Sequence, residues 1–362
     1  MINEIDLYNW GYNDFFCKQT DLYSNKNLIP ARITTEYKEQ YRIITEHGEK
    51  TAKLKGSYMY SAQTPEDYPA VGDFVLVDYN ESGDAVIHAM LGRKSKFSRL
   101  CSKGREDNRM SNEQVVAVNF DYVFIMSSLN HDFNAKRIER YITLAWQSEA
   151  IPVVILTKAD LVDDFSEQVK AVQKTAVDVD IVAVSALNGY GLEKLSEYLK
   201  PGKTIVFLGS SGVGKSSLVN ALACEKLMAV KTIREDDSKG RHTTTRRQLI
   251  MLPSGVMIID TPGMRELGMW DVSVGLSEAF TDVEEFLGEC KFSDCRHESE
   301  PGCAVKEAIA SGVLSEERWK SYLNLKKEAK YSDDRPAALC EKQQWHKTLA
   351  KWNKQNKKNG GK

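Results

Sequence analysis

Residues 209–217 read GSSGVGKSS and follow the apolar segment TIVFLG, which ends at Gly209. The spacing Gly209-x4-Gly214-Lys215-Ser216 is that of a phosphate-binding loop set between a strand and a helix. The glycines let backbone N–H groups turn toward phosphate oxygens, and the following helix presents its positive end. Lys215 is expected to reach the β- and γ-phosphates, and Ser216 to bind Mg²⁺. The predicted contacts are Gly209, Ser210, Ser211, Gly212, Val213, Gly214, Lys215, Ser216 and Ser217.

A second motif precedes this loop in the chain. The predicted buried strand IPVVILT runs into Thr157-Lys158-Ala159-Asp160. A carboxylate at Asp160 can accept two parallel hydrogen bonds from N1–H and the amino group of guanine, a donor pair that adenine lacks. The stem of Lys158 would cover the ring, while Val184-Ser185-Ala186, at the end of the next predicted strand, would supply backbone N–H to the guanine O6. The alternative is an ordinary turn at a strand end.

Two segments after the loop are predicted to be nucleotide-sensing switches. The polar segment GRHTTTRR covers residues 240–247, and the strand VMIID leads into a tight Pro-Gly turn. Asp260 is placed to hold Mg²⁺ through water, and the N–H of Gly263 can sense a γ-phosphate. One threonine among Thr243, Thr244 and Thr245 would complete the Mg²⁺ shell. Such segments are ordered by the γ-phosphate and released on hydrolysis.

Near the C-terminus, three cysteines and a histidine are crowded together as Cys290-x4-Cys295-x-His297-x5-Cys303. Three thiolates and one imidazole match the number and softness of ligands in a tetrahedral structural Zn²⁺ site. All four positions are filled by protein, which disfavours a catalytic metal. The alternative is that the cysteines lie close together by chance.

The rest of the chain indicates a multidomain protein without a membrane span or signal peptide. Its 362 residues exceed one typical core, and the net charge is only −2. Short alternating segments over residues 31–92 predict an antiparallel barrel of the OB type, or else a β-module that binds nothing. The basic run GRKSKFSRLCSKGR is either a solvated linker or a grip on phosphate backbone. From Asp121 onward, predicted strands such as YVFIMSS alternate with predicted helices such as GLEKLSEYL, as in a doubly wound α/β sheet.

The motifs TKAD, VSA, GSSGVGKSS, HTTT and DTPG, in that order, resemble the circularly permuted GTPases. With the predicted barrel ahead and the cysteine cluster behind, the chain resembles the ribosome-small-subunit-dependent GTPase A family (RsgA, or YjeQ) over about residues 30–330. The resemblance implies a cytoplasmic, monomeric GTPase that uses GTP/GDP and Mg²⁺ and carries one structural Zn²⁺. It implies action late in assembly of the bacterial small ribosomal subunit, binding to rRNA, and slow hydrolysis stimulated by the subunit.

Two positions depart from patterns common among GTPases. Thr157 stands where an asparagine usually braces the base site, which predicts somewhat weaker nucleotide affinity with retained guanine specificity. Met264 stands where Ras-like enzymes carry a water-orienting glutamine, and a thioether cannot orient water. The resemblance includes a hydrophobic residue there. Catalysis must then use another group: His242 is one candidate, or it is a loop histidine without a role. Lys215 and Thr244, the threonine favoured for Mg²⁺, are the other predicted catalytic residues.

The predicted fold is α/β, a circularly permuted phosphate-loop GTPase domain with an N-terminal OB-like barrel and a C-terminal helical zinc-binding domain. The main functional hypothesis is a subunit-stimulated GTP hydrolase, and the alternative is a GTP-gated RNA clamp with little turnover. A third reading, an ATP-dependent RNA remodeller, is disfavoured by Asp160. The predicted segments are an extension (1–30), the barrel (31–95), a basic linker (96–120), the GTPase domain (121–275), the zinc domain (276–335) and a basic tail (336–362).

Overall fold

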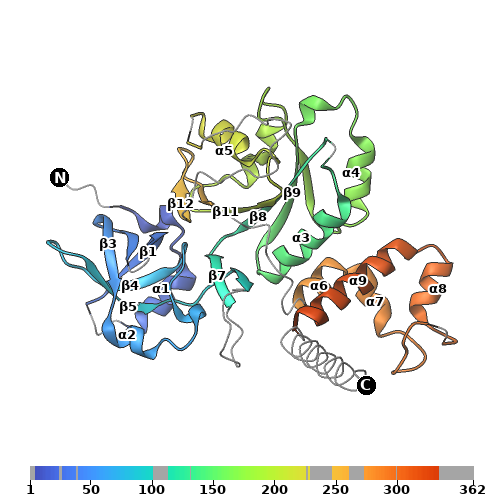
Figure 1. Cartoon of the computed structure of the whole chain (residues 1–362), viewed down its shortest axis with the longest axis horizontal. Coiled ribbons are helices and arrows are strands. Elements are labelled where there is room, and N and C mark those ends of the chain that lie inside the picture. Colours follow the sequence, from blue (N-terminus) through green and yellow to red (C-terminus); the bar gives the residue numbers. More distant parts are fainter. Residues whose placement is uncertain are drawn as a thin grey trace, which may run out of the picture. The chain divides into compact units, whose positions relative to one another are not determined.

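The phosphate loop leaves the end of an inner strand of a mainly parallel sheet (Figure 1). The structure, a computed structural model of the chain, describes residues 5–23, 27–37, 40–100, 113–130, 132–225, 227–228, 247–260, 273–298 and 300–333. It divides into two units, Met1–Leu267 and Gly268–Lys362, which we describe separately.

In the described part of the first unit, this sheet begins with the strand order β10-β9-β8-β11-β13-β12 and continues from β12 into the N-terminal strands through an antiparallel pairing of Gln248 with Thr35. All neighbours are parallel except β12, which runs antiparallel to β13. The strands are β8 (Tyr122–Ser128), β9 (Ile151–Thr157), β10 (Asp180–Ala183), β11 (Thr204–Gly209), β12 (Gln248–Met251) and β13 (Met257–Asp260). The associated helices are α3 (Ala135–Gln147), η3 (Ala159–Leu161), α4 (Ser166–Gln173), η4 (Leu192–Glu197) and α5 (Lys215–Ala223).

The inner strands are continuous apolar runs because helices cover both faces of the sheet. Phe124, Ile155 and Ile205 are fully buried, and α5 packs Leu218 and Val219 into the same core. The strands predicted from YVFIMSS, IPVVILT and TIVFLG are therefore present with the expected bounds. The predicted helix GLEKLSEYL is present only as the short 3-10 helix η4.

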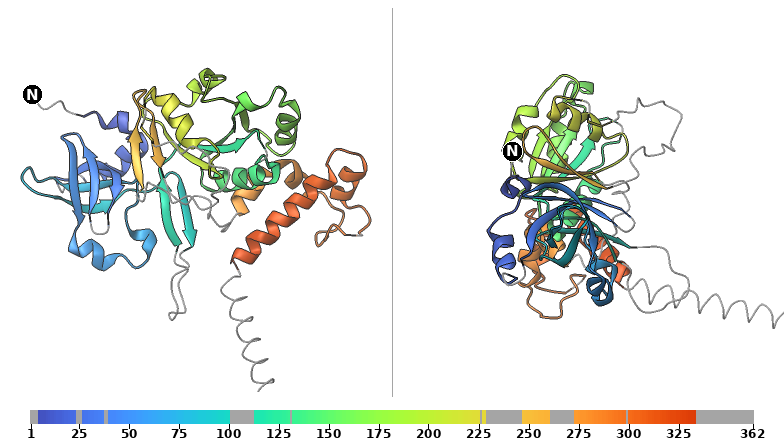
Figure 2. Two further views of the ribbon diagram at one scale, coloured as in Figure 1. Left: turned by 45° about the horizontal axis from the view of Figure 1, so that its top comes forward. Right: turned by 90° about the vertical axis from the view of Figure 1, so that its left-hand side faces the viewer.

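The N-terminal barrel is closed by five strands within the described residues 29–90, in the order β1-β2-β3-β5-β4 with β4 returning to β1 (Figure 2). The pair β3–β5 is parallel and the others are antiparallel, which is the arrangement of an OB barrel. This part of the fold prediction is confirmed. The elements are β1 (Ile29–Glu36), β2 (Tyr41–Thr45), β3 (Gly48–Leu54), α2 (Gly56–Ser61), η2 (Pro65–Asp67), β4 (Phe74–Asp78) and β5 (Ala85–Met90).

Two elements before β1 pack their aromatic side chains on the barrel: η1 (Leu7–Trp10) and α1 (Asp14–Asp21). Phe16 is 1% exposed, and its ring centroid lies 4.2 Å from that of Phe74. Where the sequence predicts a linker over residues 96–120, the structure has two antiparallel strands, β6 (Lys96–Leu100) and β7 (Glu113–Val118).

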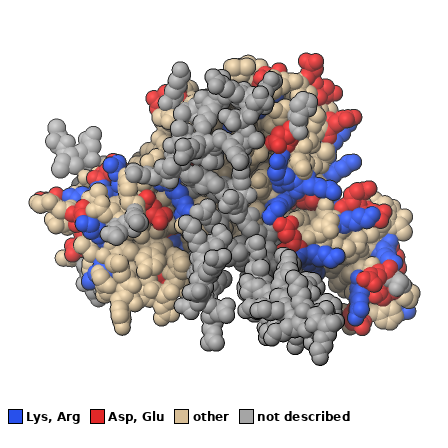
Figure 3. Space-filling model, in the orientation of Figure 1, with Lys and Arg blue, Asp and Glu red and all other residues tan. Residues whose placement is uncertain are grey.

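The described members of the basic run make contacts within the protein. Arg93 pairs with the fully buried Asp73 at 2.7 Å, and Lys96 pairs with Glu66. The ammonium of Lys94 lies over the rings of Phe15 and Phe16. Neither a solvated linker nor a free phosphate grip describes Arg93, because its guanidinium balances a buried carboxylate. On the face seen in Figure 3, basic and acidic side chains are interspersed over the described surface.

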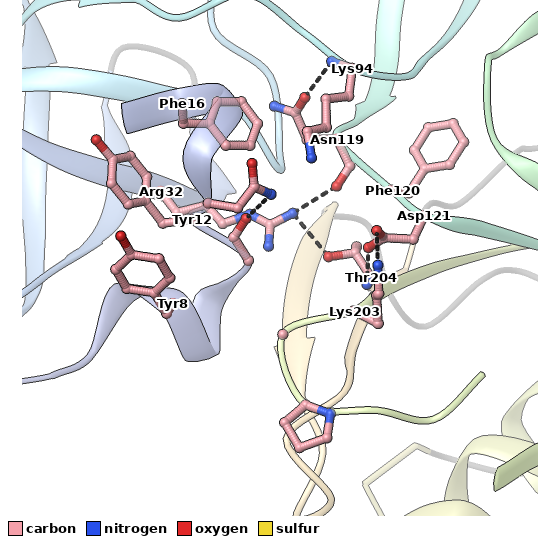
Figure 4. A pocket seen from close by; sticks show the side chains of 14 residues that line it. Tyr8, Tyr12, Phe16, Arg32, Lys94, Asn119, Phe120, Asp121, Lys203 and Thr204 are labelled. Carbon is pink, nitrogen blue, oxygen red and sulfur yellow. Dashed lines mark hydrogen bonds and ion pairs between the residues drawn. The ribbon is translucent and has the colours of Figure 1, made fainter. Parts of the chain in front are cut away.

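A buried arginine joins the barrel to the α/β sheet that carries the phosphate loop. Among the described residues, Arg32 of β1 donates five hydrogen bonds although it is only 1% exposed. The acceptors are the carbonyls of Trp10, Gly72 and Asn119, the Thr204 hydroxyl at 3.0 Å and the Met257 sulfur at 3.2 Å. Burial lowers the pKa of Arg32 to about 10. The guanidinium also lines a cavity of about 260 Å³, shown in Figure 4.

The second unit is helical, with α6 (Ser273–Ala279), α7 (Thr281–Leu287), α8 (Ala304–Ala310) and α9 (Glu316–Asp333). Phe280 and Val283 are fully buried, and Arg318 pairs with Asp282 at 2.9 Å while lying over the Phe280 ring. In the described residues of either unit, no helix combines the length and apolar character needed to span a membrane.

Candidate nucleotide site and metal cluster

The predicted base and phosphate motifs leave the same edge of the α/β sheet. Carboxyl ends of parallel strands share one edge, so the segments that follow β8, β9, β10 and β11 meet there. From β8 the chain passes outward to β9 and β10, then returns to place β11 on the other side of β8. Open α/β sheets bind ligands at such a reversal of strand order.

At the end of β9, the base motif is held in a sharp backbone turn. Lys158 has φ +60°, and Ala159 N–H donates to the Val184 carbonyl at 3.2 Å. The hydroxyl of the fully buried Ser185 donates to Asp160 Oδ1. The exposed carboxylate of Asp160 is therefore aimed by Ser185 before any ligand arrives. The sequence predicted backbone donors around Ser185 and Ala186 but not this hydroxyl contact.

Thr157 connects the base motif to the phosphate loop. Its hydroxyl donates to the Val213 carbonyl at 2.6 Å, and the side chain is buried at 4% exposure. A threonine therefore makes a direct brace to the loop at the position where the sequence suggested a lost amide. The predicted weakening of nucleotide affinity stays a prediction.

The phosphate loop runs from β11 into α5 in the shape that its glycines require. Gly214 has φ +107° and caps α5, whose first residue is Lys215. A Cβ on Gly209 would lie 2.8 Å from the Met126 carbonyl oxygen, so a larger residue would push β11 away from β8. Within the described residues, Lys215 Nζ forms an ion pair with Asp260 Oδ1. The cation predicted for the phosphates thus lies beside the carboxylate predicted for the metal.

A carboxylate that the sequence analysis did not select also contacts the loop. Ser210 Oγ donates to Asp132 Oδ2, while Arg137 Nη2 lies 3.0 Å from Asp132 Oδ1. Burial alone would raise the pKa of Asp132, but the Ser210 hydrogen bond, Arg137 and the charge of Lys158 hold it below its usual value. In the sequence, Asp132 is marked only by its place in a polar stretch directly after the strand YVFIMSS. The pairing of β8 with β11, which the sequence does not reveal, brings Asp132 to the phosphate loop.

Several predicted site residues lie outside the described residues. These are His242, Thr243, Thr244, Thr245, Gly263 and Met264. Their proposed roles stay predictions.

The cysteine cluster of the second unit has the geometry of a tetrahedral metal site. The ligand atoms of Cys290, Cys295, His297 and Cys303 all lie within 4.8 Å of one another. The sulfurs of Cys290 and Cys303 are 3.9 Å apart, and His297 Nδ1 is 3.4 Å from Cys303 Sγ. Tetrahedral Zn²⁺ requires about 3.8 Å between two thiolates and about 3.6 Å between thiolate and imidazole. The donor set therefore fits a closed Zn²⁺ site.

Comparison with known proteins agrees with this arrangement. The sequence profile of the RsgA GTPase family matches residues 91–270. The chain is 45% identical over 348 residues to small ribosomal subunit biogenesis GTPase RsgA 1 of Listeria innocua, covering 95% of this chain and 96% of the relative. It is 44% identical over 314 residues to RsgA 2 of Lactiplantibacillus plantarum, covering 86% of this chain and 87% of that protein.

Two solved structures share the fold. YjeQ from Thermotoga maritima has a TM-score of 0.63 at 27% identity, covering 82% of this chain and 97% of that structure. YloQ, described as a circularly permuted GTPase, has a TM-score of 0.58 at 23% identity, covering 84% and 96%. With base motif, phosphate loop and cysteine cluster in this order, the chain belongs to the RsgA family of circularly permuted GTPases, which are GTP hydrolases.

Proposed function

We propose that this protein binds the small ribosomal subunit and its rRNA and acts in late maturation of the subunit, hydrolysing GTP to GDP and phosphate faster when the subunit is bound. The Thr157–Val213 hydrogen bond is the observation that carries the nucleotide site, because it brings base motif and phosphate loop within reach of one nucleotide. The ribosomal role is supported by relatives about 45% identical that are named small ribosomal subunit biogenesis GTPases.

In the proposed site, guanine is read by Asp160, covered by the stem of Lys158, and contacted by backbone near Ala159, Ser185 and Ala186. The phosphates are held by the backbone of residues 209–217 and by Lys215. Mg²⁺ would supply charge neutralisation between the phosphates, held by Ser216 and Thr244, with Asp260 acting through water. Gly263 would sense the γ-phosphate.

The Lys215–Asp260 ion pair gives this site an exchange step. Since Lys215 Nζ contacts Asp260 Oδ1, Lys215 must leave this carboxylate to reach phosphate oxygens. Asp260 would then be free to hold Mg²⁺ through water, and the ion would supply charge neutralisation for the phosphates. The side chains of Lys215 and Asp260 are only 31% and 9% exposed, so separating this ion pair costs free energy unless each side chain gains a new partner. The phosphates would be the new partner of Lys215, and water on Mg²⁺ would be that of Asp260.

Cys290, Cys295, His297 and Cys303 would hold one structural Zn²⁺ that fixes the loop between α7 and α8. We further propose a monomer, located in the cytoplasm where ribosomal subunits are assembled. The six predicted segments stand as proposed domains, with strands β6 and β7 inside the segment 96–120.

GTP hydrolysis by the full chain, with and without purified small ribosomal subunits, tests this function. The proposal expects turnover that rises with subunit concentration, and competition by GDP but not by ATP. Hydrolysis that the subunit leaves unchanged, with tight binding that depends on GTP, would instead support an RNA clamp gated by nucleotide. Competition by ATP would contradict the role of Asp160.

A further inference from the structure

The phosphate loop is held at two points on its outer side. Val213 is held from β9 by Thr157, and Val213 N–H closes the turn on the Ser210 carbonyl at 3.4 Å. Ser210 is held from the segment after β8 by Asp132. Ser211 and Gly212, between these points, are exposed. The Thr157 brace belongs to the predicted base motif, whereas the Asp132 contact belongs to no predicted motif.

Asp132 is itself held in place by its neighbours. Asn130 Oδ1 accepts hydrogen bonds from the Ser128 hydroxyl at 2.7 Å and from Asp132 N–H at 3.2 Å. Asn134 caps α3 by accepting from Arg137 N–H at 3.0 Å, which sets Arg137 in the first turn. Arg137 then contacts both the carboxylate and the carbonyl of Asp132. The carboxylate thus stands on a β8–α3 turn that local hydrogen bonds define.

The two oxygens of this carboxylate have different partners. Oδ2 accepts from Ser210, and Oδ1 faces Arg137. A negative charge beside a loop that receives a triphosphate is unfavourable unless a cation balances it, because like charges repel at this range. Arg137 is that cation, and Lys158 of the base motif adds to it. The described groups therefore form a short chain from Arg137 through Asp132 to the phosphate loop.

We propose that Asp132 is a positioning residue that fixes the phosphate loop through Ser210, with Arg137 as the counter-ion that makes this carboxylate compatible with a bound triphosphate. The inference rests on the proposed nucleotide site. It predicts that the loop is ordered before the nucleotide binds, so the binding free energy is not reduced by the entropy cost of ordering the loop.

Equilibrium binding of GDP and of the slowly hydrolysed analogue GTPγS to full-chain variants tests the proposal. Ser210→Ala removes the donor to Asp132 and should weaken both nucleotides equally, by about 3–10-fold. The loss is uniform because the contact acts on the loop and not on the γ-phosphate.

Arg137→Gln tests the charge argument. It leaves Asp132 ionised without its partner, so GTPγS should weaken more than GDP, and the difference should shrink at high salt. The double variant Asp132→Asn/Arg137→Gln removes both charges and should restore the wild-type ratio of the two affinities. A role limited to folding would lower both affinities together and would not be reversed by removing the carboxylate.

A matched control is available on α4, where Ser166 Oγ donates to Asp164 Oδ1 at 2.6 Å in an exposed turn. Ser166→Ala and Asp164→Asn should leave both affinities unchanged. Wild-type affinities in Ser210→Ala and Arg137→Gln would overturn the positioning role alone. So would a double variant whose GTPγS-to-GDP ratio stays altered. A wild-type chain that binds no guanine nucleotide would overturn the proposed site and this role together.

Discussion

The metal cluster and the nucleotide site are built in opposite ways. The four candidate metal ligands all lie in the segment from Cys290 to Cys303, and the loop between α7 and α8 brings their ligand atoms within 4.8 Å. The residues of the proposed nucleotide site extend from Asp132 to Asp260, and they meet only because five parallel strands end at one edge. We therefore expect the cysteine cluster to need its metal ion to keep its shape, whereas the hydrophobic core of the sheet holds the nucleotide site in shape without a ligand.

The largest effect should follow from breaking the local site. Replacing the buried Cys303 by Ser removes one thiolate, so the chain should lose zinc, and the helices of residues 273–333 should lose their cooperative melting transition. Zinc content and helical circular dichroism check this. The exposed Cys224→Ser is the matched control and should keep both. A full complement of zinc in Cys303→Ser would show that this sulfur is not a ligand.

Removing the phosphate cation should cost most at the sheet-edge site. Lys215→Ala should lower kcat/KM for GTP by at least about 100-fold, because the charge acts on phosphates at the reacting end. The fold should survive, since core strands and not this ion pair build the site. Hydrolysis kinetics and a melting curve measure both, with the exposed Lys170→Ala as control. If Lys215→Ala unfolded, the nucleotide site would depend on its own charged residues for its structure, contrary to the difference drawn between the two sites.

Changing the base reader should alter specificity more than stability. Asp160→Asn should weaken GTP by about 100-fold, since an amide cannot accept both guanine hydrogen bonds. The same amide can donate to a carbonyl, so xanthosine triphosphate should gain affinity. Competition binding with GTP and xanthosine triphosphate measures this change of specificity. The control Asp163→Asn, in the same exposed loop, should change the affinity for neither nucleotide.

The smallest effect should come from the brace between the two motifs. Thr157→Val keeps the shape and removes the hydroxyl, so GTP and GDP should both weaken by about 3–10-fold with unchanged preference for guanine. Thr157→Ser keeps the donor and should behave like wild type. Equal affinities in the valine and serine variants would mean that the Val213 contact contributes nothing to nucleotide binding.

The difference between the cysteine cluster and the sheet-edge site also explains which features could be predicted from the sequence. Spacing alone grouped Cys290, Cys295, His297 and Cys303, whose ligand atoms lie within 4.8 Å of one another, because these residues are neighbours in the chain as well as in space. Strands such as IPVVILT and TIVFLG were predicted because continuous apolar runs mark covered parallel strands. The barrel followed from alternation and turn residues, and its closure is seen in the β1–β4 pairing.

The order of strands in the sheet was not available from local patterns. Asp132 matters because β8 lies between β9 and β11, and this order depends on pairings between distant segments. The aiming of Asp160 by Ser185 and the brace by Thr157 were missed for the same reason. Arg93 and Arg32 were hidden too, since a basic side chain in a strand or charge run is normally exposed, and only tertiary packing shows the buried acceptors.

Arg32 gives the first unit a mechanical property. It grips Thr204, the first residue of β11, and the last residue of the same strand begins the phosphate loop. Five residue steps of extended chain, about 17 Å, separate the two ends. Twisting the barrel against the sheet would break the hydrogen bonds that Arg32, only 1% exposed, donates to Thr204 and Met257 of the sheet, so barrel and sheet resist rotation against each other. A load applied to the barrel is thereby delivered to the base of the strand that carries the nucleotide loop.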